Sequence, residues 1–155
     1  MCIRDSYLTR QIDGSYNKNG SIFMDYSNAS DFSDRNTIIY GHHMRTGNMF
    51  GKLVNFKSDN YYQQHDHMFI MTPQVTYRLE LLCGAVVEPD DPIYSIDPTE
   101  EALAACMRRS TFQTKLDLPG EEARLVTLST CSYEFEDARY IVIGVLTPLE
   151  ETVKN

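Results

Sequence analysis

A cysteine, a histidine and an arginine stand out in the sequence because their side chains could together carry out nucleophilic catalysis. Cys131 ends the run 127–131 (Thr-Leu-Ser-Thr-Cys), Arg139 follows eight positions later, and His42 lies far upstream, directly after Gly41. A thiolate can attack a carbonyl carbon, and an imidazole can exchange protons with the thiol and with a leaving amine. A cationic donor can stabilise the oxyanion that forms. No second cysteine stands at metal-ligand spacing from Cys131, so the pattern indicates a cysteine nucleophile and therefore an enzyme.

The chemistry of Arg139 restricts its role. A guanidinium stays protonated at physiological pH, so Arg139 cannot be a base, whereas its forked donors suit an oxyanion or a substrate carbonyl. Backbone N–H groups near Cys131 could share that task. The alternative is a surface ion pair worth up to ~1 kcal/mol with a carboxylate of its own loop, for which the candidates are Glu134, Glu136 and Asp137. For Cys131 and His42 the alternatives are structural: a strand-end thiol and a core-facing histidine that donates to a backbone carbonyl.

Side-chain alternation along the strand that ends at Cys131 places two hydroxyls beside the thiol. Thr127 and Ser129 lie on the same face of this strand as Cys131. We expect them either to contact substrate or only to satisfy neighbouring polar groups. Arg139 begins the next predicted strand, and if the two strands form an antiparallel hairpin, Arg139 faces Cys131 at its mouth.

The two adjacent histidines cannot do the same job. In the predicted strand 36–44, His42 shares one face with Ile38 and Tyr40, while His43 points to the opposite face. We therefore expect His42 to be the partner of the thiol, and His43 to be structural or to line the substrate site.

The bulk composition indicates one soluble, folded domain. The 155 residues suffice for a single core, and the net charge of -8, without a cluster of Lys and Arg, argues against a nucleic-acid partner. No apolar run is long enough to span a bilayer. Of the four cysteines, Cys83 and Cys106 lie in apolar surroundings and are interpreted as small buried hydrophobes. Cys2 belongs to residues 1–6, which we interpret as a non-native or artefactual start.

The order of predicted elements indicates a mainly β fold with short helices and one longer helix before the cysteine strand. Closely spaced strands favour a closed or nearly closed barrel. The strands are expected at 20–26, 36–44, 67–71, 75–87, 92–96, 123–131 and 139–147. Helical spacing is expected from Met49 to Phe56 and in the stretch 59–65. The longer helix is expected at 102–112, after a capped start in which Pro98 takes the first helical position.

Two further groups of residues could bind a cation, although neither pattern is specific. His65-Asp66-His67 offers two imidazoles two positions apart, without a third or fourth ligand in view. The acidic stretch 88–91 is interpreted as a solvated turn, with a calcium site as the alternative. We expect no metal site and no cofactor.

Several stretches of the chain resemble the sortases, the cysteine transpeptidases of Gram-positive bacterial surfaces. The resemblance runs from about Tyr7 to Leu149. Its main motifs are 40–44 (Tyr-Gly-His-His-Met), 127–131 and 139–144 (Arg-Tyr-Ile-Val-Ile-Gly), and 20–26, 49–53 and the long helix point to class B. The resemblance places the family's catalytic histidine on His42, its nucleophile on Cys131 and its arginine on Arg139.

The resemblance implies a sortase-like closed β-barrel of about eight strands, formed by one catalytic domain at 7–155. Such an enzyme cleaves a sorting motif near the C-terminus of a secreted protein and forms a thioester on Cys131. It then transfers the acyl group to an amine of a cell-wall precursor or pilin, without a cofactor. The implied location is the extracellular face of the membrane of a Gram-positive bacterium. Sortases carry an N-terminal apolar anchor, and we expect this anchor to be missing from the chain, which is soluble as given.

Two rival functions stay open at this point. A papain-type cysteine hydrolase acting on peptide or peptidoglycan also uses Cys and His, but its cysteine normally precedes its histidine and opens a helix. An inactive barrel that only binds surface peptides is the non-enzymatic rival. The exact sorting motif and the acceptor amine are not predicted from the sequence.

Overall fold

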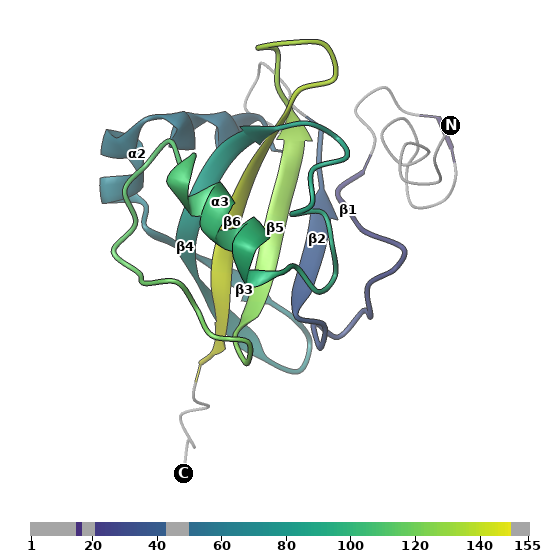
Figure 1. Ribbon diagram of the computed structural model, residues 1–155. Coiled ribbons are helices and arrows are strands. Elements are labelled where there is room, and N and C mark those ends of the chain that lie inside the picture. The colour runs from purple at the N-terminus through teal and green to yellow at the C-terminus, as the bar shows by residue number, and fades with distance from the viewer. Residues whose placement is uncertain (1–14, 17–20, 43–49, 150–155) are drawn as a thin grey trace.

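The computed structural model of the protein describes residues 15–16, 21–42 and 50–149 (Figure 1). The strands are β1 (Phe23–Met24), β2 (Asn36–Tyr40), β3 (His67–Met71), β4 (Thr76–Val87), β5 (Arg124–Cys131) and β6 (Arg139–Pro148). A 3-10 helix, η1 (Gly51–Lys57), and two α-helices, α2 (Asp59–Gln64) and α3 (Glu100–Arg108), complete the described elements. Within the described residues, no helix is both long and apolar enough to cross a membrane.

All six strands belong to one sheet in the order β1-β2-β5-β6-β4-β3. Every neighbouring pair is antiparallel except β2 and β5, which run parallel. The long central strands are rich in Val, Ile and Leu, as expected for strands that are buried on both faces. The register of β4 against β6 shifts between Leu81 and Cys83, and irregularities of this kind bend a strand and help a sheet to curl.

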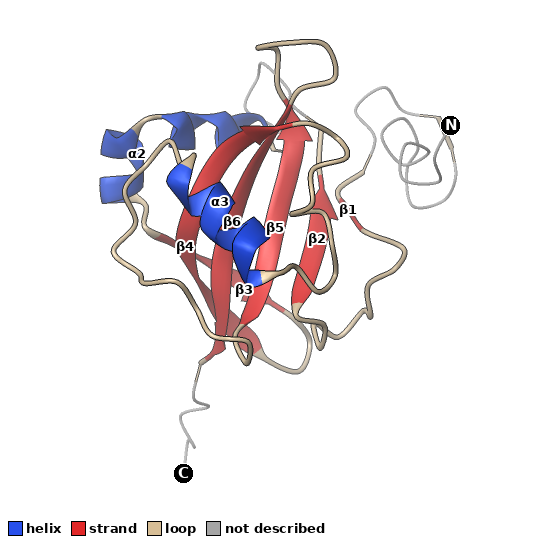
Figure 2. Cartoon of the chain, in the orientation of Figure 1, coloured by secondary structure: helices blue, strands red, loops and turns tan. Residues whose placement is uncertain are grey.

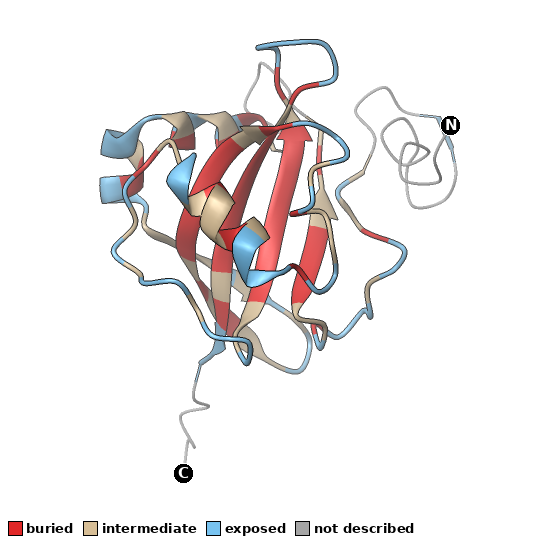
Figure 3. Cartoon of the chain, viewed as in Figure 1, coloured by how far each residue is buried: buried red, intermediate tan, exposed pale blue. Residues whose placement is uncertain are grey.

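The sheet separates two hydrophobic cores. Helix α3 crosses one face, and the core beneath it contains Leu103, Cys106, Ile93 and the side chains of β6 that point this way (Figure 2). The other core is covered by η1 and α2, whose Phe56 and Tyr62 pack against even-numbered residues of β5 and β6. Burial accordingly concentrates in the middle of the strands (Figure 3).

The mainly β fold, with few short helices and one longer helix before the cysteine strand, is confirmed. The structure shows six strands within its described residues, whereas the resemblance implied about eight. The strand at 67–71 has the predicted limits, and β4, β5 and β6 begin or end within one residue of prediction. The predicted helical region after Met49 is a 3-10 helix followed by a short α-helix.

The predictions for 92–96 and for the end of the long helix are wrong, in both cases because tertiary hydrogen bonds replace the local preference. Residues 92–96 form turns, since the side-chain amide of Asn36 donates to the carbonyls of Ile93 (3.3 Å) and Ser95 (2.8 Å). The long helix ends at Arg108 rather than at 112, because the N–H of Thr111 donates to Gly84 O (2.8 Å).

The start of this helix also differs from prediction. Thr99 is the N-cap, and its hydroxyl accepts a hydrogen bond from the N–H of Ala102 (3.1 Å). Pro98 therefore lies before the cap, not at the first helical position.

Candidate active site

The hairpin of β5 and β6 places Cys131 directly opposite Arg139. The two residues are register partners in the antiparallel pair, and the N–H of Ser132 donates to Ala138 O (2.8 Å) one step further on. Cys131 is half-buried and is a thiol rather than part of a disulfide. The two side chains therefore leave the same face at the mouth of the hairpin, as expected if 123–131 and 139–147 pair.

The parallel pairing of β2 and β5 brings His42 to the same place. Tyr40 is the register partner of Ser129, and the N–H of Gly41 donates to Ser129 O (3.0 Å). His42 lies two positions after Tyr40, and Cys131 lies two positions after Ser129. Because β2 and β5 run in the same direction, both residues come at the same end of this pair. The ends of β2 and β5 thus lie at the same end of the sheet as the start of β6, in three adjacent strands (Figure 1). His42 follows the end of β2, whereas Cys131 ends β5 and Arg139 begins β6.

Phe50 contacts the backbone of both Gly41 and His42. Its N–H donates to His42 O (3.0 Å), and its ring lies over the buried Gly41. A Cβ on Gly41 would lie 2.5 Å from Phe50 Cδ2, so only glycine allows this approach. His42 is half-buried, and its Nδ1 is buried without a hydrogen-bond partner among the described residues. The N–H of Gly41 and the carbonyl of His42 are therefore each held by a hydrogen bond.

Arg139 shows none of the ion pairs that would make it a structural residue of its own loop, as far as the described residues extend. Its Nη1 donates to two backbone carbonyls, those of Asp137 (3.3 Å) and Ala138 (3.4 Å). Glu134, a candidate partner in the sequence, pairs with Lys57 of η1 instead. Arg139 therefore keeps a positive charge that no described carboxylate neutralises.

The two hydroxyls on the cysteine face have protein partners. Thr127 is fully buried and donates to Asn36 Oδ1 (2.8 Å), four positions away from the thiol. Ser129, two positions from Cys131, is bonded to the hydroxyl of Tyr94 at 2.7 Å. Burial raises the pKa of Tyr94, which therefore stays a neutral phenol that can donate to Ser129. A substrate role for Ser129 and Thr127 stays a prediction.

A surface pocket adjoins the arginine end of this site. It is lined by Val86, Val87, Glu88, Asp90, Asp91, Pro92, Arg109 and Phe135. Val87 is the register partner of Arg139, and Phe135 belongs to the loop between Cys131 and Arg139. The acidic stretch 88–91 forms part of this wall, where Asp91 pairs with Arg109 (3.2 Å). The pocket thus lies next to the start of β6, but neither Arg139 nor Cys131 is among its lining residues.

The other candidate residues lie away from this site or outside the described part. His43 lies outside the described residues, as does Cys2. Cys83 and Cys106 are fully buried against each other, with their sulfur atoms 3.2 Å apart, so the prediction that they pack as hydrophobes is confirmed.

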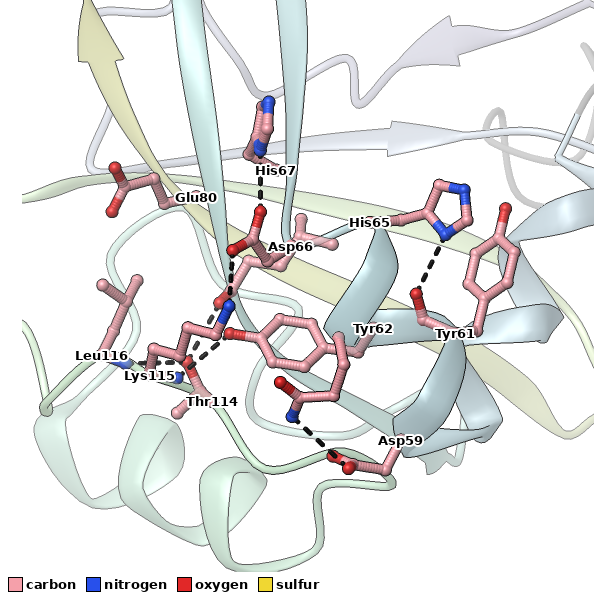
Figure 4. Close-up of polar contacts among 12 residues, drawn as sticks. Asp59, Tyr61, Tyr62, His65, Asp66, His67, Glu80, Thr114, Lys115 and Leu116 are labelled. Carbon is pink, nitrogen blue, oxygen red and sulfur yellow. Dashed lines mark hydrogen bonds and ion pairs between the residues drawn. The ribbon is translucent and has the colours of Figure 1, made fainter.

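The imidazoles of His65 and His67 have different partners. His65 Nδ1 lies 3.0 Å from Tyr61 O, and His67 Nδ1 lies 2.8 Å from Asp66 Oδ1 (Figure 4). Among the described residues, no group of three or more His, Cys, Asp or Glu side chains is placed to hold a metal ion.

Sequence reasoning missed Tyr94 and Lys57, which contact the cysteine strand and its loop. Tyr94 meets Ser129 across 35 positions of chain, and Lys57 meets Ser132 across 75. No local pattern around either residue signals these contacts. Tyr94 falls in a stretch that was predicted as a strand, and Lys57 is the last residue of η1.

Comparisons with known proteins identify the family and the fold of the chain. The sortase domain family model matches residues 4–147. Sortase B of Listeria monocytogenes is 31% identical over 92% of this chain and 60% of that protein. The structure of a Staphylococcus aureus sortase B–substrate complex has a TM-score of 0.84 at 24% identity, covering 94% of this chain and 70% of that one, and this likeness shows the fold alone.

A class B sortase of Streptococcus pyogenes involved in pilus biogenesis has a TM-score of 0.79 at 30% identity, covering 92% of this chain and 80% of that one. The chain spans about three fifths of the length of the curated relatives it matches.

Proposed function

Because the chain belongs to the sortase family, we propose that it is a class B sortase-like cysteine transpeptidase whose nucleophile is Cys131. The observation that carries this proposal is the meeting of three strand ends. Cys131 stands opposite Arg139 in the register of β5 and β6, and His42 follows β2 on the neighbouring strand. These three side chains supply the nucleophile, the proton carrier and the oxyanion donor that an acyl transfer needs.

In the proposed reaction, the Cys131 thiolate attacks the scissile carbonyl of the peptide. Arg139 stabilises the oxyanion of the tetrahedral intermediate, and His42 in its protonated form gives its proton to the departing amine. The product of this half-reaction is a thioester on Cys131. An incoming amine then attacks the thioester and loses a proton to His42, and the thiolate leaves.

We propose secreted proteins with a C-terminal sorting signal as donors, and an amine of a peptidoglycan precursor or a pilin as acceptor. The Streptococcus pyogenes relative, which is involved in pilus biogenesis, supports a pilin as one of these possibilities. The cell surface of a Gram-positive bacterium is the corresponding location. We propose residues 7–155 as the catalytic domain, and the match of the sortase domain family model to residues 4–147 supports one domain over most of this range.

A panel of sorting-motif peptides tests this function. We expect wild-type protein to cleave one motif at a single bond, and an added amine to appear in the product, with both events read by mass spectrometry. Cys131→Ala should remove both. Absence of cleavage of every peptide by folded, unmodified protein would contradict the proposal, provided that a separate sample of the same protein reacts with iodoacetamide at Cys131.

The same assay separates the rival functions. A papain-type hydrolase would release acid whether or not the amine is added, and an inactive peptide-binding barrel would bind peptides without cleaving them. The structure does not favour the papain-type hydrolase. Its cysteine would normally precede its histidine and open a helix, whereas Cys131 ends β5 and follows His42 in the chain.

A further inference from the structure

Lys57 touches both sides of the hairpin mouth that carries Cys131 and Arg139. Its Nζ donates to Ser132 Oγ (2.8 Å), directly after Cys131, and it lies 5.4 Å from the ring centroid of Tyr140, directly after Arg139. Lys57 also forms an ion pair with Glu134 of the intervening loop. One ammonium at the end of η1 thus contacts the neighbours of both candidate catalytic residues.

Lys57, Ser132 and Glu134 are all hydrogen-bonded to one another. Ser132 accepts from Lys57 and donates to Glu134, whose carboxylate also accepts from Lys57. Ser132 and Tyr140 are both buried, and the hydroxyl of Tyr140 is bonded to Thr111 Oγ1 at 2.8 Å. The end of η1 and the loop are therefore fixed to each other on the sheet face opposite to Cys131.

Glu134 keeps its charge at any pH at which the enzyme would work. Partial burial acts to raise the pKa of Glu134, but the hydrogen bonds from Lys57 and Ser132 outweigh it and lower the pKa to about 2. Lys57 therefore has a permanent counter-ion within the loop.

We propose that Lys57 is a positioning residue of the active site: through Ser132, Glu134 and Tyr140 it holds the hairpin mouth so that Arg139 stays opposite Cys131. This inference rests on the proposed function. Lys57 contacts no reacting atom in this scheme, and it acts only through the alignment of the two strand ends.

The chain offers a matched control for Lys57. Lys115 also forms an ion pair, with Asp66 (2.9 Å), and also lies over an aromatic ring, that of Tyr62 at 6.0 Å (Figure 4). These contacts lie at the junction of α2 and β3, outside the candidate site. Lys115→Met therefore removes the same kinds of contact without touching the hairpin mouth.

We expect Lys57→Met to lower kcat for the cleaved sorting-motif peptide by ~10-fold or more with KM little changed, because misalignment affects the transition state. Lys57→Arg should recover most of the loss, since it keeps the charge and the donors. Lys115→Met should keep wild-type kcat. Melting temperatures of both Met variants should fall by only about 3 °C, as for partly exposed ion pairs.

The pH dependence of Cys131 alkylation by iodoacetamide separates positioning from plain electrostatics. Removing the negative charge of Glu134 in Glu134→Gln should by itself favour the thiolate and lower the midpoint. Loss of alignment moves the positive charge of Arg139 away from the thiol and so disfavours the thiolate. We expect this second effect to be the larger one, so that the midpoint rises. If Lys57→Met unfolds the protein, the alkylation midpoint of Glu134→Gln alone decides whether the positioning role holds.

The outcomes also separate this inference from the proposed function. Wild-type kcat and alkylation midpoint in both Lys57→Met and Glu134→Gln overturn the role of Lys57, even if the enzyme is a sortase. A midpoint that falls in Glu134→Gln, with unchanged kcat, overturns it as well. Wild-type protein that cleaves no sorting-motif peptide refutes the function instead, while a raised midpoint would still support the alignment by Lys57.

Discussion

At the scale of single residues, the three described cysteines differ in burial and in surroundings. Cys131 is half-buried at a strand end, whereas Cys83 and Cys106 are fully buried. The hydrogen bond with Cys106 and the burial of the site raise the pKa of the Cys83 thiol, which keeps it in its unreactive protonated form. These differences give a direct test of which thiol is the nucleophile.

We expect a thiol-reactive substrate analogue to modify Cys131 and neither of the buried cysteines in the folded protein. Peptide mapping by mass spectrometry identifies the labelled residue. Cys83→Ala and Cys106→Ala should keep activity, although each leaves a small cavity in the core. Equal labelling of all three thiols in folded protein would remove the reason to single out Cys131.

The two histidines should respond very differently to substitution. Since we propose His42, two positions after the end of β2, as the proton carrier, His42→Gln should abolish turnover, while His43→Gln should have a far smaller effect. The pH dependence of kcat/KM should be bell-shaped, with limbs that belong to the thiol and imidazole as a coupled pair. The opposite ranking of the two variants would mean that the other histidine is the proton carrier.

Arg139→Lys keeps a positive charge and loses the forked donor geometry. If the guanidinium binds the oxyanion, turnover should fall by roughly 10²-fold or more while the fold survives. The measurement is turnover of one fluorogenic sorting-motif peptide, recorded together with the melting temperature. A stable and fully active Arg139→Lys protein would leave the oxyanion to backbone N–H groups near Cys131.

At the scale of elements, the predictable part of the site is the part that local patterns encode. Alternation with a period of two correctly assigned Cys131 and Ser129 to one face, because it depends only on neighbouring residues. The hairpin that joins Cys131 to Arg139 was predictable because its loop is short. The parallel pairing of β2 with β5 connects segments about 90 residues apart, and only the family resemblance linked His42 to Cys131.

The same reasoning explains the errors and omissions. The expected strand at 92–96 does not form because Asn36, far away in the chain, takes its carbonyls. Tyr94 and Lys57 escaped notice for the same reason, since their contacts join distant elements. Sequence patterns specify which face a side chain occupies, and tertiary packing decides what it meets there.

The contact between Gly41 and Phe50 gives a prediction for the end of β2. An alanine Cβ at Gly41 would lie 2.5 Å from the Phe50 ring, so the ring must move, and the hydrogen bond from Phe50 N to His42 O moves with it. We expect Gly41→Ala to lower kcat by ~10-fold or more, because small displacements of catalytic groups are costly. The cost in unfolding free energy should be roughly 1–3 kcal/mol.

Gly120→Ala is the matched control for this substitution. Nothing lies within 4 Å of a Cβ added at Gly120, which is exposed, so kcat and melting temperature should stay at wild-type values. Wild-type kcat in Gly41→Ala would show that the position of His42 does not depend on the Phe50 contact.

At the scale of the whole molecule, two ion pairs outside the cores connect elements that are distant in the chain. Asp66, before β3, binds Lys115 in the segment after α3, and Lys57 of η1 binds Glu134 of the β5–β6 loop. Both carboxylates have lowered pKa values. The hydrogen bonds from His67 and Lys115 lower the pKa of Asp66 to about 2, and that of Glu134 is also about 2. Because of these lowered pKa values, the free energy of unfolding depends on pH in the acid range.

The sign of this linkage follows from proton binding. Between about pH 2 and 4.5, the unfolded chain binds protons at these two carboxyls that the folded chain does not bind, so the free energy of unfolding rises with pH in this window. The stabilisation is fully present above about pH 4.5 and is lost as the pH falls through about 2. Since the side chain of Asp66 is 33% exposed and that of Glu134 is 40% exposed, we expect each to shift the melting temperature by only about 3 °C.

Melting temperatures recorded from pH 2 to 7 should therefore be nearly flat above pH 5 and fall below it. Asp66→Asn should melt below wild type at pH 6 and approach it near pH 2, because its contribution is then absent from both proteins. Asp90→Asn, which alters an exposed carboxylate after β4, is the control and should run parallel to wild type. An Asp66→Asn curve that keeps a constant offset from wild type across this range would mean that the stabilisation by Asp66 does not depend on its charge.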